Sequence, residues 1–206
     1  MRLGIMGGTF DPIHNGHLLI AQEAGWRLEL DRVLFIPTGN PPHKQNHEIA
    51  SDEHRCRMVQ LAIADNPLFE LSTIELERQG FSYTVDTLEA LHARYGPGTD
   101  FYFITGADAA ADLLTWHLPQ RILELAHLVV AERPGYQLPV AKLQAGLPGI
   151  NLAKRLVMLD VPMVEVSSHE LRERIARCIP VKYLLPDEVM AYIVQEKLYQ
   201  GDNYRC

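Results

Sequence analysis

The sequence is poor in cysteine and has no long apolar run. Its three cysteines, Cys56, Cys178 and Cys206, lie far apart and form no CxxC pair. Such a set favours free thiols in a reducing compartment over a disulfide framework. No apolar stretch reaches the length of a membrane span, and the first residues show no signal-peptide pattern. We therefore expect a cytoplasmic protein that has no membrane partner.

The chain also lacks an excess of positive charge. It carries 19 Lys and Arg against 26 Asp and Glu, which gives a formal net charge of −7 at pH 7. Surfaces that bind nucleic acid need clustered positive charge, so this balance argues against nucleic acid as a partner. A small phosphate ligand needs only a few local donors and stays compatible with it.

The length of 206 residues and the hydrophobic fraction of 47% are those of a globular protein with its own core. We expect a single domain over residues 1–200, with a helical subregion at about 167–200. The tail at residues 201–206 is expected to be frayed.

Short apolar runs alternate with segments of helical periodicity along the chain. We expect strands at residues 3–6, 33–36, 69–76, 101–105, 128–131, 157–159 and 164–166. We expect helices at residues 16–30, 51–64, 84–95, about 107–125, 168–177 and 187–198. This alternation predicts an α/β fold, a Rossmann-like, doubly wound and mostly parallel sheet with helices on both faces. Ligands of such sheets bind at the carboxyl ends of the strands.

The segment after the first strand carries the strongest signal and reads GGTFDPIHNGH at residues 7–17. Gly7 and Gly8 allow a tight turn and a close approach of a ligand to the backbone. The start of the next helix offers unpaired N–H groups to a phosphate. His14 and His17 can both lie near that helix start and donate hydrogen bonds to charge that develops during phosphoryl transfer. A plain turn and a half-formed metal site are the alternatives, but no third ligand follows at a usual spacing, so we expect no metal held by the protein.

This string resembles the GxFxPxHxGH signature of the nucleotidyltransferase superfamily related to class I tRNA synthetases. Within that superfamily, the chain is similar to the bacterial nicotinate mononucleotide adenylyltransferases over residues 3–198. The other matching segments are PPHK, FSYTVDTL, the GAD turn with a tryptophan after it, ERPGY and VSSHELR. The resemblance implies adenylyl transfer from ATP to nicotinate mononucleotide, which gives nicotinate adenine dinucleotide and pyrophosphate in NAD biosynthesis.

The resemblance assigns a role to each matching residue. The catalytic residues it implies are His14, His17 and Arg172. The ATP-binding residues it implies are Gly7, Gly8, Thr9, Phe10, Gly106, Asp108, Ser167 and Ser168. Thr9 and Phe10 would contact the reacting phosphate through the backbone, and the carboxylate of Asp108 would accept hydrogen bonds from the ribose. For Asp108 an ordinary helix cap is the alternative.

The second family signature, usually ISSTxIR, reads VSSHELR at residues 166–172. By resemblance Arg172 clamps the β- and γ-phosphates, a task that suits a planar and permanently charged donor fork. His169 stands where the family has threonine, which leaves the hydroxyl contact of that position in doubt. Ser167 and Glu170 also have the spacing of a capping box, and capping can coexist with phosphate binding at one helix start.

The mononucleotide side is predicted from other segments. Trp116 offers a flat apolar face on which a pyridine ring can stack, although a lone tryptophan is also a common core residue. Thr84 matches the family position near the nicotinate carboxylate. The residues that resemble the family's phosphate-holding positions are Asn40, His43, Lys44 and Arg133. The loop at residues 40–48 is the segment that we expect to close over the substrate.

The expected partners are ATP, which carries Mg²⁺ on its phosphates, and nicotinate mononucleotide; a homo-oligomer stays open. Several alternatives remain at this point. The enzyme could act on nicotinamide mononucleotide or phosphopantetheine, it could be a cytidylyltransferase, or the chain could be a nucleotide-binding regulator without catalysis. An NAD-binding module is disfavoured, because the sequence has no GxGxxG turn with an acidic residue about 20 positions later.

Overall fold

The structure, a computed structural model, describes residues 1–40, 49–132, 137–162 and 165–200. Within these residues, six parallel strands form one sheet in the order β3-β2-β1-β4-β5-β6. The strands are β1 (Arg2–Gly8), β2 (Arg32–Pro37), β3 (Phe69–Leu71), β4 (Asp100–Gly106), β5 (His127–Ala131) and β6 (Leu156–Leu159). This is the Rossmann order, in which the chain starts at the centre of the sheet and returns there after its first half. The predicted fold class is confirmed.

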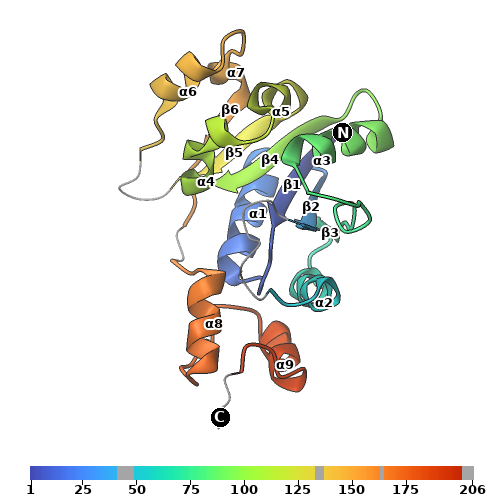
Figure 1. Cartoon of the computed structure of the whole chain (residues 1–206), viewed down its shortest axis with the longest axis vertical. Coiled ribbons are helices and arrows are strands. Elements are labelled where there is room, and N and C mark those ends of the chain that lie inside the picture. Colours follow the sequence, from blue (N-terminus) through green and yellow to red (C-terminus); the bar gives the residue numbers. More distant parts are fainter. Residues whose placement is uncertain (41–48, 133–136, 163–164, 201–206) are drawn as a thin grey trace.

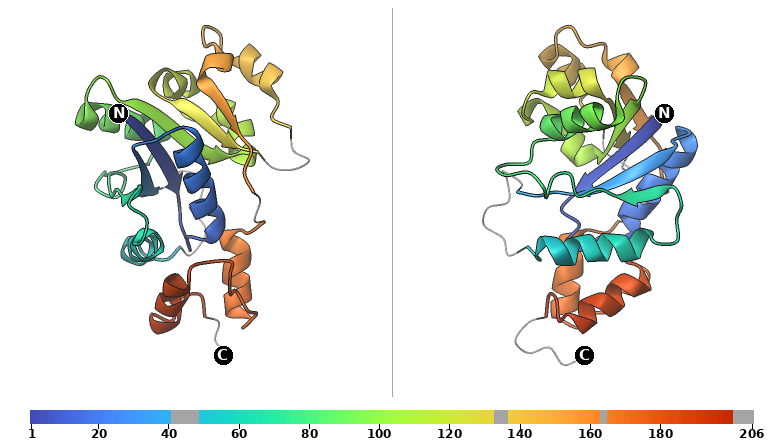
Figure 2. Two further views of the ribbon diagram at one scale, coloured as in Figure 1. Left: turned by 180° about the vertical axis from the view of Figure 1, so that it is seen from behind. Right: turned by 90° about the vertical axis from the view of Figure 1, so that its right-hand side faces the viewer.

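Helices cover both faces of the sheet and form a further layer at one end (Figures 1 and 2). The helices after the first strands are α1 (Asn15–Arg27), α2 (Asp52–Ile63), α3 (Thr84–Tyr95) and α4 (Ala107–Ala111). A 3₁₀ helix, η1 (Leu113–Thr115), is followed by α5 (Pro119–Leu125), α6 (Val140–Gly146), α7 (Leu152–Arg155), α8 (Ser168–Ala176) and α9 (Asp187–Gln195). No helix among the described residues is both long and apolar enough to span a membrane.

Neighbouring residues of one strand pack against different helices. On β2, Val33 and Phe35 join a core cluster with residues of α1 and α2. Leu34 and Ile36 join a second cluster with residues of α3 and α5. Side chains two positions apart on a strand share a face, so both faces of β2 are buried. This explains why the strands read as unbroken apolar runs in the sequence.

Of the C-terminal helices, α8 lies beside the N-terminal end of α1 and α9 lies against α2 (Figures 1 and 2). Leu171 and Ile175 of α8 and Val189 and Ile193 of α9 are buried in the same cluster as α1 and α2. The backbone N–H of Asn15 also donates to the carbonyl of Leu184, at 3.0 Å, in the connection between α8 and α9. The last part of the chain is therefore fixed against the start of the first helix.

Several predicted elements differ from the observed ones in length. The strand expected at residues 69–76 ends at Leu71, because the chain then turns and the N–H of Leu76 bonds to the carbonyl of Thr73 at 2.9 Å. The long helix expected at about 107–125 is interrupted before α5, where Leu118 adopts a left-handed conformation with φ 50° and Pro119 follows.

Other differences concern elements that were missed or misplaced. The short helices α6 and α7 were not predicted, because they lie in a stretch dense in proline and glycine. Of the strand expected at residues 164–166, Glu165 and Val166 are described and lie outside any strand. Cys56 is a free thiol, but Cys178 is disulfide-bonded, so the expectation of free thiols is wrong for Cys178. The tail at residues 201–206 lies outside the described residues.

Candidate active site

Two adjoining pockets lie at the carboxyl ends of the central strands. The first has a volume of about 520 Å³ and is lined by His14, Gly16, His17, Ile20, Gly106, Ala107, Asp108, Ala131, Glu165, Val166, Ser167, Ser168, His169 and Arg172. The second, of about 360 Å³, is lined by Thr9, Phe10, Asp11, His17, Ile49, Ser168, His169 and Arg172. They lie between β1 and β4, where the strand order reverses and where ligands of such folds bind.

The pockets bring together residues that were predicted from separate segments. All three predicted catalytic residues line the first pocket, together with Gly106, Asp108, Ser167 and Ser168. Thr9 and Phe10 line the second pocket, which shares His17 and Arg172 with the first. Gly7 and Gly8 end β1 directly before this segment.

The motif loop after β1 is shaped by close packing of Phe10. This residue adopts a left-handed backbone conformation with φ 52°, and its ring is buried. A Cβ at Gly8 would lie 3.0 Å from the ring of Phe10, so a larger residue would require the ring to shift by a few tenths of an ångström. The ring of Phe10 meets His17 edge-on with centroids 5.1 Å apart. Through this ring contact, the motif loop packs directly against the imidazole of His17.

His14 and His17 stand at the start of α1, as the spacing predicted. His14 is the residue before the first turn, and its backbone N–H donates a hydrogen bond to Nδ1 of His17 at 3.3 Å. An accepting Nδ1 leaves the proton of a neutral imidazole on Nε2. Burial lowers the pKa of His14 to about 4, and burial with the neighbouring His14 lowers the pKa of His17 well below its usual value. Both rings are therefore neutral near pH 7.

The start of α8 reaches the same pocket from the other end of the chain. The hydroxyl of Ser167 accepts a hydrogen bond from the N–H of Glu170 at 3.2 Å, so the predicted cap of this helix is present. The hydroxyl of Ser168 donates to the carbonyl of Pro12 at 2.8 Å. This bond joins α8 to the motif loop. The N-termini of α1 and α8 thus point into one pocket, and each carries a partial positive charge.

Gly106 and Asp108 form the turn between β4 and α4. Gly106 is the residue before the helix, so the alternative in which Asp108 is an ordinary cap is wrong. Asp108 lies in the first turn of α4 and is exposed along the pocket. A Cβ placed on Gly106 would meet no protein atom within 4 Å. The packing of the chain therefore does not require glycine at this position. A side chain there would instead occupy open space in the pocket.

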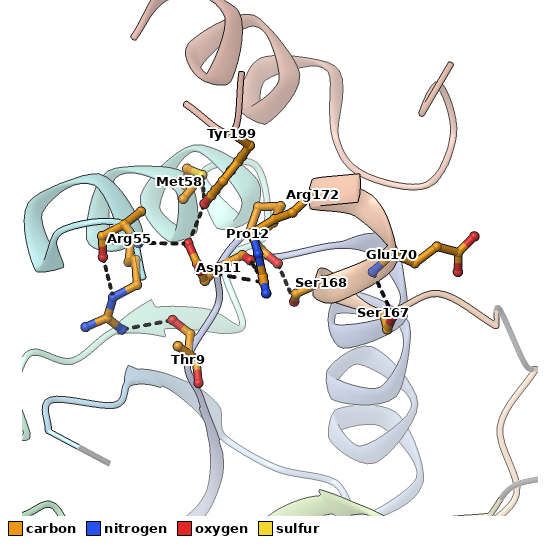
Figure 3. Close-up of polar contacts among 11 residues, drawn as sticks. Thr9, Asp11, Pro12, Arg55, Met58, Ser167, Ser168, Glu170, Arg172 and Tyr199 are labelled. Carbon is orange, nitrogen blue, oxygen red and sulfur yellow. Dashed lines mark hydrogen bonds and ion pairs between the residues drawn. The ribbon is translucent and has the colours of Figure 1, made fainter. Parts of the chain in front are cut away.

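A buried carboxylate for which no role was predicted lies in the wall of the second pocket; its contacts are drawn in Figure 3. Asp11 is 2% exposed, and its Oδ1 accepts hydrogen bonds from the hydroxyl of Tyr199 at 2.6 Å and from the N–H of Ala50 at 3.3 Å. Nη1 of Arg172 donates to the backbone carbonyl of Asp11 at 2.7 Å and lies 3.6 Å from its Oδ2. Asp11 thereby links the motif loop to α8 and to the segment after α9.

Arg55 of α2 holds the same loop from the opposite side (Figure 3). Its side chain is 2% exposed, and Nη1 donates to the carbonyl of Thr9 at 2.9 Å. Nε donates to the carbonyl of Ala50 at 3.2 Å, and Nη2 pairs with Asp52. The burial of Arg55 could have been predicted from the sequence. Arg55 precedes Met58, Val59 and Ala62 at helical spacing and therefore lies on the same buried face of α2.

The predicted mononucleotide residues come together through their neighbours. The carbonyl of Asn40 accepts a hydrogen bond from the N–H of Ser82 at 3.0 Å, two residues before Thr84 and the start of α3. The ring of Tyr83 lies 4.5 Å from that of His117, the residue after Trp116. Asn40, Thr84 and Trp116 thus belong to one region.

Trp116 itself is only partly buried, and it meets the ring of Phe103 edge-on with centroids 5.7 Å apart. This contact anchors one part of the indole in the core.

The buried carboxyl of Glu75 accepts a hydrogen bond from Thr87 at 2.8 Å, and burial raises the pKa of Glu75. A buried acid of this kind ties the segment after β3 to α3.

Some predicted residues lie outside the described part of the chain. They are His43, Lys44 and Arg133, together with all of the loop at residues 40–48 except Asn40. His169, which replaces the family threonine, is described. It is exposed, lines both pockets, and pairs through Nε2 with Glu173 at 3.3 Å.

Comparisons with known proteins identify the family of the chain. The cytidylyltransferase-like family model matches residues 5–174. A protein of Moorella thermoacetica named "Probable nicotinate-nucleotide adenylyltransferase" is 45% identical and aligns over 97% of this chain and 92% of its own length. One of the same name from Herpetosiphon aurantiacus is 48% identical over 96% of this chain and 98% of its own length.

The fold has solved counterparts. The Plasmodium falciparum nicotinic acid mononucleotide adenylyltransferase complexed with NaAD superposes with a TM-score of 0.78 at 18% identity, covering 96% of this chain and 97% of that one. A likeness at this identity supports the fold, while the two bacterial relatives carry the family assignment. The chain therefore belongs to the cytidylyltransferase-like family and, within it, to the nicotinate-nucleotide adenylyltransferases.

Proposed function

We propose that the protein transfers the adenylyl group of ATP to nicotinate mononucleotide and releases pyrophosphate. One observation carries this proposal. The N-termini of α1 and α8, the imidazoles of His14 and His17, and the guanidinium of Arg172 converge on one pocket. In a chain whose net charge is −7, this concentration of donors suits a polyphosphate.

The residues suggest how ATP lies in the pocket. The ribose hydroxyls would donate to the carboxylate of Asp108, and the backbone of Gly106 would lie against the nucleoside, in the space that a side chain would fill. The α-phosphate would lie at the start of α1, near His14 and His17. Arg172 would bind the β- and γ-phosphates in the part shared by the two pockets.

The reaction needs positioning and charge stabilisation more than proton transfer. An ionised phosphate oxygen of the mononucleotide attacks the α-phosphorus of ATP, a new P–O bond forms, and the bond to the β-phosphate oxygen breaks. The electron pair leaves with pyrophosphate, so no base has to remove a proton. The neutral N–H donors of His14 and His17 would stabilise the extra charge on the α-phosphate oxygens in the transition state.

The mononucleotide would lie beside the N-terminus of α3. Trp116 would stack on the pyridine ring, and Thr84 would face the carboxylate that distinguishes nicotinate from nicotinamide. The phosphate of the mononucleotide would be held by Asn40 and by His43, Lys44 and Arg133, the last three from outside the described residues. The preference for nicotinate over nicotinamide would come from N–H and hydroxyl donors, because a charged carboxylate accepts hydrogen bonds from them more strongly than a neutral amide does.

Magnesium would enter with ATP. Among the described residues no three His, Cys, Asp or Glu side chains group in a way that could hold a metal ion. The carboxylate of Asp11, which lines the second pocket beside Arg172, is already bonded to Tyr199 and Arg172. Phosphate oxygens and water are the ligands that Mg²⁺ usually keeps, so the ion would neutralise the polyphosphate without a cage of side chains.

The test is pyrophosphate release from Mg-ATP with nicotinate mononucleotide, nicotinamide mononucleotide and phosphopantetheine supplied in parallel, and with the dinucleotide product identified by mass. Strong release with the acid alone supports the proposal and its carboxylate preference. Equal release with acid and amide keeps the reaction and removes the preference. Release with phosphopantetheine alone reassigns the acceptor, and ATP binding without any release would indicate a regulator.

A further inference from the structure

The carboxylate of Asp11 has no task in the reaction just described, although it lies beside the pockets. It is almost fully buried, and burying a charge is costly unless it is paired and hydrogen-bonded. Its partners come from three distant parts of the chain, namely Ala50 before α2, Arg172 on α8 and Tyr199 after α9. A carboxylate held by so many donors has a fixed position.

Arg172 is the partner that faces the substrate. Its side chain is 27% exposed and lines both pockets, while Nη1 bonds to the backbone carbonyl of Asp11 at 2.7 Å and lies 3.6 Å from its carboxylate. A guanidinium has five N–H donors in a rigid plane. Fixing one edge of that plane on Asp11 therefore aims the remaining donors into the pocket.

Tyr199 fixes Asp11 in turn. Its hydroxyl lies 2.6 Å from Oδ1 of Asp11 and 3.9 Å from the sulfur of Met58, and Figure 3 shows the ring entering from the C-terminal segment. Burial, together with the charge of Asp11, raises the pKa of Tyr199, so its O–H stays protonated and can donate. A phenylalanine would fill the same space without this bond.

We propose that Asp11 and Tyr199 form a positioning pair that holds Arg172 in the orientation needed to bind the β- and γ-phosphates of ATP. The inference rests on the proposed function for the identity of the phosphates. It adds two residues whose role is to position Arg172, although Asp11 also lines the second pocket. Loss of the pair lowers affinity for ATP and leaves affinity for the mononucleotide unchanged.

The experiment compares Tyr199→Phe with Tyr192→Phe. Tyr192 makes a similar hydrogen bond, at 2.8 Å to Nδ1 of His54, and it also joins the C-terminal part to α2, but it does not contact Asp11. For Tyr199→Phe we expect KM for Mg-ATP and the directly measured Kd of ATP to rise about 5- to 20-fold, less than the full effect of a lost hydrogen bond to a charged group because Tyr199 acts through Asp11. KM for the mononucleotide should stay the same, and Tyr192→Phe should change neither constant.

Two results would overturn the inference. One is an equal effect of both substitutions, and the other is a fall in kcat with both KM values unchanged, which would mean only a smaller folded fraction. In an Arg172→Lys background, Tyr199→Phe should add almost nothing, whereas a purely structural role would add its full effect. If Tyr199→Phe does not fold, Asp11→Asn provides the second test and should also raise KM for ATP without changing KM for the mononucleotide. Unchanged KM values for Asp11→Asn would overturn the inference as well.

The Kd of ATP separates this inference from the proposed function. If the wild-type protein releases no pyrophosphate with any acceptor, the proposed function fails, yet the effect of Tyr199→Phe on ATP binding can still be measured. If the wild-type protein is active and Tyr199→Phe binds ATP normally, the positioning pair fails and the proposed function stands.

Discussion

The imidazole of His14 lies stacked on that of His17, with ring centroids 3.7 Å apart and ring planes inclined by 26°. Protonation of either ring would place a positive charge against its neighbour, which adds to the cost of burial. The stack therefore keeps two neutral donors side by side at the start of α1. This arrangement leads to separate expectations for catalysis and for stability.

Replacing His17 with Ala should lower turnover by about 100-fold or more, the usual cost of losing a donor to the transition state. His17→Gln, which keeps a neutral N–H group, should recover part of that loss. The measurement is kcat at saturating ATP and mononucleotide, with circular dichroism to verify folding. Unchanged turnover in a folded His17→Ala protein would show that His17 is not a transition-state donor.

The pKa of His14 makes stability depend on pH. Its folded value is about 4 against 6.5 for the unfolded chain, so below pH 6.5 the unfolded state takes up a proton that the folded state does not. This site therefore lowers the free energy of unfolding as the pH falls from 6.5 to 4, by roughly 3 kcal/mol in all. Urea unfolding at several pH values should show a smaller loss for His14→Gln than for the wild type.

Gly106→Ala should separate stability from ATP binding. The backbone at Gly106 has φ −78° and a Cβ there meets no protein atom, so alanine should leave the free energy of unfolding unchanged or raise it by about 0.4–1 kcal/mol. The same methyl group would occupy space needed by the nucleoside and cost about 1–3 kcal/mol of ATP binding. Calorimetric titration of ATP and urea unfolding of the same sample test both halves. An unchanged Kd would place the nucleoside elsewhere.

Arg55→Met should destabilise the fold strongly, although Arg55 touches no substrate. The carbonyls of Thr9 and Ala50 would lose their buried donors, at a cost of about 2–4 kcal/mol. Arg57, exposed on the same helix, provides the matched control, since Arg57→Met should change the free energy of unfolding by less than about 0.5 kcal/mol. Equal effects of the two substitutions would mean that the network around Arg55 contributes nothing.

Trp116→Leu should weaken the mononucleotide and not ATP. Loss of stacking on the pyridine ring should raise KM for nicotinate mononucleotide by about 3- to 10-fold. Trp26 on α1 is 71% exposed, so Trp26→Leu removes an indole without touching the region of Trp116. Steady-state kinetics with each substrate varied in turn distinguish the cases. A rise in KM for ATP alone would contradict the assignment.

The convergence of the two motifs on one pocket could be predicted from the sequence because each motif is local. The segment from Gly7 to His17 is continuous, and a turn followed by a helix start determines where its glycines and histidines lie. Arg172 could be added because it belongs to a second short motif at another helix start. The parallel sheet then brings the two together at its carboxyl edge.

The buried residues that support the motif loop, Asp11 and Arg55, could not be predicted in this way. Asp11 meets Tyr199 only through the packing of α8 and α9, and no local pattern encodes such a contact. Arg55 had a periodic signal, but a charged side chain on an apolar face does not reveal which carbonyls it will bind. The ends of some strands and helices were predicted wrongly for a different reason. A turn such as the one after Leu71 depends on backbone hydrogen bonds, which the strand propensity of the residues does not specify.

The bond between Asp11 and Tyr199 spans 188 positions of the sequence. During synthesis the sheet and its phosphate loop can form well before the ribosome has released the last helices. A nascent chain at that stage would have the central strands and Ala50 but neither Arg172 nor the hydroxyl of Tyr199. Full affinity for ATP would therefore be gained late in translation, and a protease cut between α8 and Tyr199 would weaken it.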